Sequence, residues 1–191
     1  MPAPERTTPD AIVAAGRAIV EDRGLDALTM SAVAERVGVR APSLYKRVGD
    51  RDALVRGIAE STVDDLGARM HAAVEQVETG AGDCPRDVLI TLGHELREFA
   101  HEYPNGFRLI FGPLSAAARP DLAALWRATR PMLDAATELA GEVHALEAAR
   151  TLTAWANGFL IMELADAFRL GGDLDDAYKW GLTSIVDAMS R

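Results

Sequence analysis

The chain has one cysteine and no long apolar run. Because Cys84 is the only cysteine in 191 residues, an internal disulfide and a cysteine-based zinc site are excluded. Such a low cysteine content is typical of proteins in a reducing compartment. The most apolar stretch, residues 156–165, has about half the ~20 residues that a membrane helix needs. The first ten residues lack the apolar core of a secretory signal and are expected to form a short arm. These absences predict a cytoplasmic protein without a membrane span.

Catalytic motifs are also missing. The sequence contains no phosphate-binding glycine loop and no Gly-x-Ser-x-Gly turn, and an alanine run follows Ser115. No stretch alternates in the manner of a strand. We therefore expect an all-α protein that is not an enzyme and needs no cofactor. A small helical enzyme whose catalytic residues meet only in the fold remains the alternative.

Residues 28–54 predict two short helices joined by a glycine turn. Thr29 is the expected N-cap of the first helix, and Gly38 is its expected end. The apolar face of that helix is formed by Met30, Val33, Ala34 and Val37. In the second helix Pro42 suits the first turn, while Leu44 and Val48 lie one turn apart as inward anchors.

The outward side of the second helix carries hydroxyl, aromatic and basic groups, namely Ser43, Tyr45, Lys46 and Arg47. From Arg36 to Arg51 five basic residues face one acidic residue, a local net charge of +4, whereas the whole chain has −9. A confined basic patch on an acidic protein limits contact with a polyanion to that patch. Such a helix fits the major groove of DNA.

Residues 8–66 resemble the DNA-binding domain of the TetR family of one-component transcriptional regulators. The resemblance rests on residues 24–29, on Ala34 with Gly38 and Val39 at the turn, and on residues 43–45 and 52–54. It implies an all-α fold with a helix-turn-helix DNA-binding domain in residues 1–55 and a helical ligand-binding and dimerisation domain in residues 56–191. It also implies a homodimer, most often a repressor, that binds a near-palindromic double-stranded DNA operator and is released or modulated by a small-molecule effector.

The DNA-binding surface is expected to combine the cap, the turn and the second short helix. Within it, Lys46, Arg47 and Arg51 are expected to contact phosphates, and Ser43 and Tyr45 to lie at the groove. Arg47 and Gly49 depart from the residues frequent in the family, which leaves the base preference open. The full predicted set is Thr29, Arg40, Ala41, Pro42, Ser43, Tyr45, Lys46, Arg47 and Arg51.

Glycine and proline divide the rest of the chain into further helices. A first helix is expected between Thr8 and Gly24, a linker at residues 79–85, and the other helices at 52–78, 86–102, 105–111, 120–140, 145–170 and 174–190. Small and apolar residues on the last two helices predict a dimer interface of Met162, Ala177, Gly181, Ser184, Ile185 and Ala188. Residues 155–158 are similar to the Trp-His-Gly type of TetR C-terminal domain, with Asn157 in place of the histidine.

Large apolar residues expected inside the second domain are candidates for an effector pocket. They are Leu92, Phe99, Phe107, Trp126, Met132, Trp155 and Phe159, and each also suits plain core. They predict an apolar or aromatic effector. A ligand-independent DNA-binding protein, with a filled core in place of a cavity, is the other alternative.

One polar pattern suggests metal binding. His94, Glu98 and His101 are spaced i, i+4 and i+7 on one helix face, a spacing that suits a divalent cation. The polar neighbours Glu95 and Arg97 are typical of a solvated helix face instead. The sequence therefore predicts no metal site and leaves these three residues as a candidate.

Overall fold

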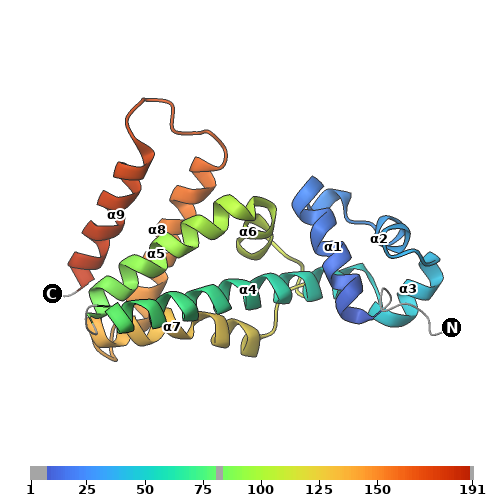
Figure 1. Cartoon of the computed structure of the whole chain (residues 1–191), viewed down its shortest axis with the longest axis horizontal. Helices are drawn as coiled ribbons and strands as arrows, with labels where there is room; N and C mark the ends of the chain where they lie inside the picture. The colour runs from blue at the N-terminus through green and yellow to red at the C-terminus, as the bar shows by residue number, and fades with distance from the viewer. Residues whose placement is uncertain (1–7, 81–83, 190–191) are drawn as a thin grey trace. The chain divides into compact units, whose positions relative to one another are not determined.

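The computed structural model describes residues 8–80 and 84–189. In these two ranges the chain forms nine α-helices and one short 3-10 helix, without a strand (Figure 1), which confirms the predicted all-α class. The elements are α1 (Pro9–Arg23), η2 (Leu25–Ala27), α2 (Met30–Val37), α3 (Ala41–Val48), α4 (Arg51–Gly80), α5 (Pro85–Glu102), α6 (Pro104–Phe111), α7 (Leu122–Ala140), α8 (Ala145–Glu163) and α9 (Leu174–Met189). Residues 1–7 of the predicted arm and 81–83 of the predicted linker lie outside the described residues.

The chain divides into two compact units, and each unit is made of two separate stretches. The first unit contains the chain up to Asp64 together with residues Tyr103–Leu125, hence α1 to α3, the beginning of α4, and α6 with the loop that follows it. The second unit contains Asp65–Glu102 and the chain from Trp126 onward. The boundary between the two units therefore falls inside the continuous helix α4.

The core of the first unit is made of branched aliphatic side chains from all of its helices. Ile12 of α1, Leu44 of α3 and Ile58 of α4 are completely buried, and Leu109 of α6 is 4% exposed in the same cluster. Ala118, in the loop after α6, is also buried in this cluster. Residues 103–125 thus complete an apolar core that the first 64 residues begin.

Polar contacts fasten the same segment to α1 and α4. The Glu21 carboxylate accepts hydrogen bonds from the backbone N–H groups of Asn105 (3.1 Å) and Gly106 (2.9 Å) at the start of α6. The Asn105 side chain donates in return to the Glu21 carbonyl oxygen at 2.8 Å. Arg56 of α4 donates through Nε to the carbonyl oxygen of Ala117 at 2.8 Å. These contacts cap α6 and hold the loop after it.

The second unit is centred on Tyr178 of α9, which is completely buried. Its ring lies 5.2 Å from that of Trp155 and 5.1 Å from that of Phe159, both on α8. Its hydroxyl donates to the Gly93 carbonyl oxygen of α5 at 2.7 Å. Aromatic packing with a satisfied hydroxyl therefore joins α5, α8 and α9.

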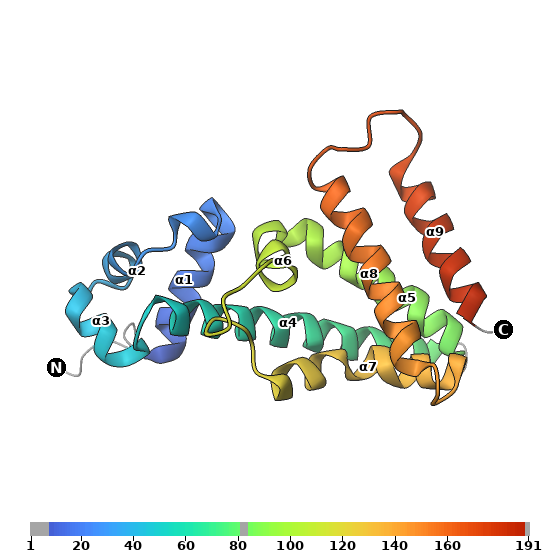
Figure 2. The same cartoon turned by 180° about the vertical axis from the view of Figure 1, so that it is seen from behind.

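Helix α8 ends earlier than the sequence predicts. Its last residue is Glu163, not residue 170, and an irregular loop leads from there to α9 (Figure 2). The Asp166 N–H donates to the Glu163 carbonyl oxygen (3.0 Å) and the Ala167 N–H to that of Met162 (2.9 Å). Asp166 has a positive φ of 49°, so this residue closes the helix in the left-handed conformation usually supplied by glycine. The prediction relied on Gly171 and Gly172 and was wrong for this reason.

Candidate nucleic-acid interface

The turn between α2 and α3 has the predicted geometry. The Thr29 hydroxyl accepts a hydrogen bond from the Ala32 N–H at 3.1 Å and caps α2. Gly38 has φ 76° and ψ 34°, and the Val39 N–H donates to the Ala34 carbonyl oxygen at 2.9 Å. A residue with a side chain is strained in this conformation, so glycine sets the angle at which α3 leaves the turn.

Burial fixes which side of α3 faces solvent. Leu44 is completely buried, and Val48 is half-buried against the same cluster. The four residues predicted for the inner face of α2 are all buried, with Val33 at 0% exposure. The opposite side of α3 is therefore free of the core, as the spacing predicts.

Almost all of the predicted DNA-binding residues lie on the surface. Thr29, Arg40, Pro42, Ser43, Tyr45, Lys46, Arg47 and Arg51 are exposed, while Ala41 is half-buried. Tyr45 is 50% exposed, so it is not a core residue of α3. Arg36, at the end of α2, adds another exposed cation next to the turn. The surface combines positive charge with hydroxyl groups, which suits phosphate oxygens and base edges.

Arg51 has a structural contact in addition to its exposure. Its Nε donates to the Leu28 carbonyl oxygen at 3.0 Å, and its Nη2 donates to that of Leu25 at 3.1 Å. These bonds fasten the start of α4 to the segment that precedes α2. A role of Arg51 in phosphate binding stays a prediction, and a change at Arg51 would also disturb this segment.

The structure corrects the predicted interior position of Trp126. This side chain is 60% exposed, because small residues form the inward side of α7. Gly67 of α4 meets Ala128 so closely that a Cβ on the glycine would lie 2.8 Å from the Ala128 Cα. Where two helices approach this closely, a tryptophan fits only on the outward side.

The other predicted effector residues are either buried in the core of a unit or half-buried against their neighbours. Leu92 and Phe99 of α5 are completely buried in the second unit, whereas Phe107 of α6 is buried in the first. Trp155 and Phe159 pack on Tyr178, and Met132 packs against the alanines of α7 and α8. These contacts suit core residues, and an effector-binding role for them stays a prediction.

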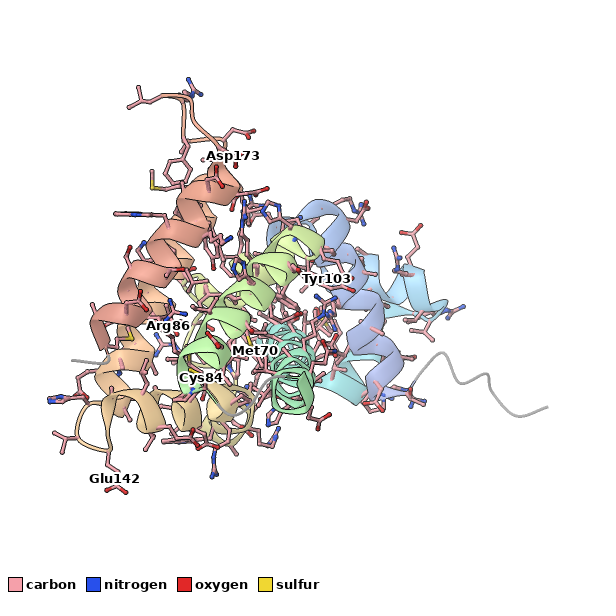
Figure 3. All side chains as sticks on the ribbon, turned by 60° about the vertical axis from the view of Figure 1, so that its left-hand side comes forward. Met70, Cys84, Arg86, Tyr103, Glu142 and Asp173 are labelled. Carbon is pink, nitrogen blue, oxygen red and sulfur yellow. The ribbon has the colours of Figure 1, made fainter. Side chains whose placement is uncertain are left out.

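A polar hollow in the second unit contains the candidate metal residues. The hollow has a volume of about 600 Å³ and is lined by His94, Arg97, Glu98, His101, Glu163 and residues 172–175; Figure 3 labels Asp173, which lies just before α9. Arg97 forms ion pairs with Glu163 and with Asp175 (2.7 Å), and its guanidinium lies 5.1 Å from the centre of the Tyr178 ring.

Neighbouring protein groups act on both histidines of this hollow. Burial lowers the pKa of His94, and the positive charge of Arg97 lowers it further. The His101 Nε2 lies 3.4 Å from Glu163. Within the described ranges, no three His, Cys, Asp or Glu side chains are arranged to hold a metal ion. The sequence pattern identified one wall of the hollow and missed Glu163 and Asp175, because these residues belong to later helices.

The predicted dimer residues differ in accessibility. Ala177, Ser184 and Ala188 of α9 are exposed, Ile185 is half-buried, and Met162 of α8 is 45% exposed. Gly181 is buried, and a Cβ at this position would collide with the Trp155 ring of the same chain. The close helix approach predicted at Gly181 therefore occurs within one chain, and Gly181 is not available to a second subunit.

The fold and the exposed basic helix define a class of helix-turn-helix regulators, and comparison with known proteins identifies the family. Residues 12–58 match the profile of bacterial regulatory proteins of the tetR family, and residues 89–185 match the tetracyclin repressor-like C-terminal domain. Together these two regions cover most of the chain. The protein belongs to the TetR family of transcriptional regulators.

Individual relatives agree with this assignment. The chain is 27% identical to the class A tetracycline repressor from transposon 1721 of Escherichia coli, over 96% of this chain and 90% of the relative. A TetR variant from Acinetobacter baumannii in complex with minocycline has a TM-score of 0.70 at 22% identity, covering 94% of each chain. BioQ bound to its double-stranded DNA operator has a TM-score of 0.66 at 19% identity, covering 95% of this chain and 97% of BioQ.

Membrane insertion and the type of the C-terminal domain were also predicted from the sequence. No helix in the described part of the chain is long and apolar enough to cross a membrane. The matching C-terminal profile is described as tetracyclin repressor-like, and the likeness to the Trp-His-Gly type stays a prediction.

Proposed function

We propose that this protein is a homodimeric repressor that binds a near-palindromic DNA operator and is released by a small apolar or aromatic effector. DNA reading is assigned to residues 1–55, and effector binding and dimerisation are assigned to residues 56–191. The observation that carries this proposal is the orientation of α3, whose Leu44 is completely buried while Ser43, Tyr45, Lys46 and Arg47 are exposed. A helix-turn-helix protein reads bases from such a face in the major groove.

The relatives support both halves of the proposal. BioQ is known in complex with its DNA operator, and the Acinetobacter TetR variant is known in complex with minocycline. By analogy, a ligand can prefer a conformation in which the α3 helices of the two subunits lie at a different distance from each other. Such a ligand shifts this protein away from the conformation that binds DNA. The shift is limited by the ratio of the effector's affinities for the two conformations.

Operator binding at several salt concentrations tests the assignment of α3. We expect Lys46→Ala and Arg47→Ala to weaken binding to all DNA sequences and to reduce the log–log salt slope by about 0.9 for each phosphate that is no longer neutralised. Arg150→Ala, which removes an exposed cation from α8, is the matched control and should leave the slope unchanged. If both α3 variants also kept the parental slope, the proposed phosphate contacts would be refuted.

The outer surface of the last two helices is the proposed dimer interface. Trp180 is 75% exposed on α9, and Ile161 and Met162 are 43% and 45% exposed on α8. A Cβ at exposed Gly158 would meet no described atom within 4 Å beyond the adjoining backbone of α8 itself, so another helix can approach α8 there. An apolar surface that also contains small residues is typical of helix pairing between subunits.

The mass of the protein in solution tests this interface. We expect Trp180→Glu to produce monomers that bind the operator poorly, because two half-sites are needed for tight binding. Val143→Glu places the same charge at another exposed position, in the turn before α8, and should leave a dimer. Gly181→Glu is unsuitable, since it would disrupt packing on Trp155 within one chain. A dimeric Trp180→Glu variant with normal operator binding would exclude this surface.

A further inference from the structure

Two adjoining hollows lie along α4 and α7 in the second unit. The larger has a volume of about 500 Å³ and is lined by His71, Trp126, Arg127 and Arg130. The smaller, of about 330 Å³, shares His71 and Arg130 with the first. Its other lining residues are Val74, Glu75, Val88, Pro131, Asp134, Ala135 and Glu138. We call the two hollows together the α4–α7 groove.

The groove begins beside a close contact between α4 and α7. At that contact the Ala128 methyl group faces Gly67, which has no side chain. A Cβ on Gly67 would lie 2.9 Å from the Ala128 Cβ. His71 follows Gly67 by one helical turn and lines both hollows. Long side chains replace small ones just beyond the contact, which leaves an open space between them.

The larger hollow is lined by an aromatic side chain and by positively charged side chains. Trp126 keeps 60% of its surface exposed, although burial of an aromatic side chain of this size would stabilise the fold. Two arginines of the same helix line the hollow beside it. An exposed tryptophan next to cations is typical of a binding surface, because an aromatic ligand can cover the indole while its anionic group pairs with the guanidinium groups.

Hydrogen bonds in the groove determine which polar atoms remain for a ligand. The His71 Nδ1 lies 2.7 Å from the Gly67 carbonyl oxygen, so Nδ1 carries a proton and neutral His71 has its lone pair on Nε2. Arg130 donates through Nε to both carboxylate oxygens of Asp134, at 2.8 and 2.7 Å. In the described part of the chain its Nη groups have no further partner, so they can donate to an anion.

The charges are distributed unequally along the groove. Arg127 belongs only to the larger hollow, whereas Glu75, Asp134 and Glu138 belong only to the smaller one. An anionic group is therefore attracted toward the end with Trp126 and repelled from the other end. This polarity gives a bound ligand one preferred orientation.

We propose that the α4–α7 groove binds an aromatic carboxylate, with the ring on the Trp126 indole and the carboxylate on Arg130 and Arg127. The inference rests on the proposed ligand-responsive function and names a site and a ligand class for it. It places the effector on a groove with an exposed tryptophan, apart from the buried Leu92 and Phe99. Because α4 continues from this groove into the first unit, a ligand held here contacts a helix shared by both units.

Calorimetric titration of the full-length protein tests the ligand class. The probes are benzoate, salicylate and 1-naphthoate, each compared with its neutral amide. We expect at least one carboxylate to saturate the protein below 1 mM and its amide to bind about tenfold more weakly, a difference of ~1.4 kcal/mol. Saturation by no carboxylate, or equal affinity of a binding carboxylate and its amide, would overturn the proposal.

Variants of the groove test the site. Trp126→Ala and Arg130→Gln should each weaken binding of the carboxylate by about tenfold, and Arg130→Lys should weaken it less than Arg130→Gln because it keeps the charge. The controls are Val143→Ala and Arg150→Gln, which change an exposed apolar residue and an exposed arginine outside the groove. Groove variants that bind like the controls would overturn the assigned site.

Operator binding by the same samples separates this inference from the proposed function. Loss of carboxylate binding in the groove variants with normal operator binding supports the site. Failure of every carboxylate to bind, together with a normal operator titration, refutes the groove alone. Carboxylate binding by a protein that binds no operator leaves the groove supported and refutes the DNA-binding function.

Discussion

The two units use polar side chains in different ways. In the first unit they bind the backbone: Glu21 accepts from two N–H groups of α6, and Arg51 and Arg56 donate to carbonyl oxygens. In the second unit the arginines mainly pair with carboxylates, as in the 2.6 Å contact of Arg86 with Asp187. Backbone contacts fix the course of the chain, whereas exposed ion pairs can exchange partners at little cost.

The apolar residues also differ between the units, although Leu122 and Leu125 of the first unit are exposed as well. The first unit buries branched side chains in one cluster that includes α6. The second unit leaves Trp126, Ile161, Met162 and Trp180 exposed, and these side chains lie in the proposed ligand and dimer surfaces. Among the ion pairs of the second unit, that between Arg97 and Glu163 differs from the exposed ones, because its side chains are only 15% and 7% exposed. The comparison indicates that the first unit presents α3 on a closely fastened core, whereas the second unit exposes apolar side chains in its proposed ligand and dimer surfaces.

The largest predicted effect concerns the Glu21 contact that holds α6. Glu21→Ala leaves two backbone donors at the start of α6 without their acceptor, which should destabilise the protein by about 1–3 kcal/mol in urea unfolding. Asp22→Ala is the control, because Asp22 is 71% exposed and lies 3.6 Å from Arg23. It should cost less than about 0.5 kcal/mol. Equal losses in the two variants would show that the backbone contacts do not strengthen the first unit.

Local patterns were sufficient to predict most of the helices, but they did not predict how the units are composed. Thr29, Gly38 and the spacing of Leu44 and Val48 predicted the turn and the exposed side of α3, since each signal lies within a few residues. The attachment of α6 to the first unit depends on Glu21 and Asn105, which are 84 residues apart. No periodicity records such a contact.

The missed features of the second unit have a similar cause. The pattern on α9 identified a stripe of small residues, but the partner of Gly181 is Trp155 of α8, and the stripe alone does not distinguish a helix of the same chain from one of a second subunit. Trp126 was expected inside because it is large and apolar. Its position follows from the close contact of Ala128, a small residue of the same helix, with Gly67 of α4.

A smaller effect is expected at the end of α8 in the second unit. Asp166 has a positive φ of 49°, so Asp166→Gly should relieve backbone strain and stabilise the protein by about 0.5 kcal/mol, after the greater chain entropy of unfolded glycine is subtracted. Ala165→Gly is the control, because Ala165 has no positive φ, and it should be destabilising. Both changes are measured by urea unfolding. If Asp166→Gly destabilised the protein as much as Ala165→Gly, the left-handed closure would not be strained.

The smallest effect is a pH dependence confined to the second unit, which contains all four histidines of the chain. Burial and then the charge of Arg97 lower the pKa of His94 in the folded protein. The unfolded chain therefore takes up a proton at His94 near its usual pKa of about 6.5, before the folded protein does. Stability from neutral His94 is present above that pH and is lost as the pH falls below it.

Urea unfolding at pH 7.5 and pH 5.5 measures this contribution. His94→Gln should lose less stability between the two pH values than the parent does, because glutamine takes up no proton. His144→Gln, which replaces an exposed histidine just before α8, should lose as much as the parent. An unchanged loss in His94→Gln would mean that the half-buried His94 does not contribute to the acid sensitivity of the protein.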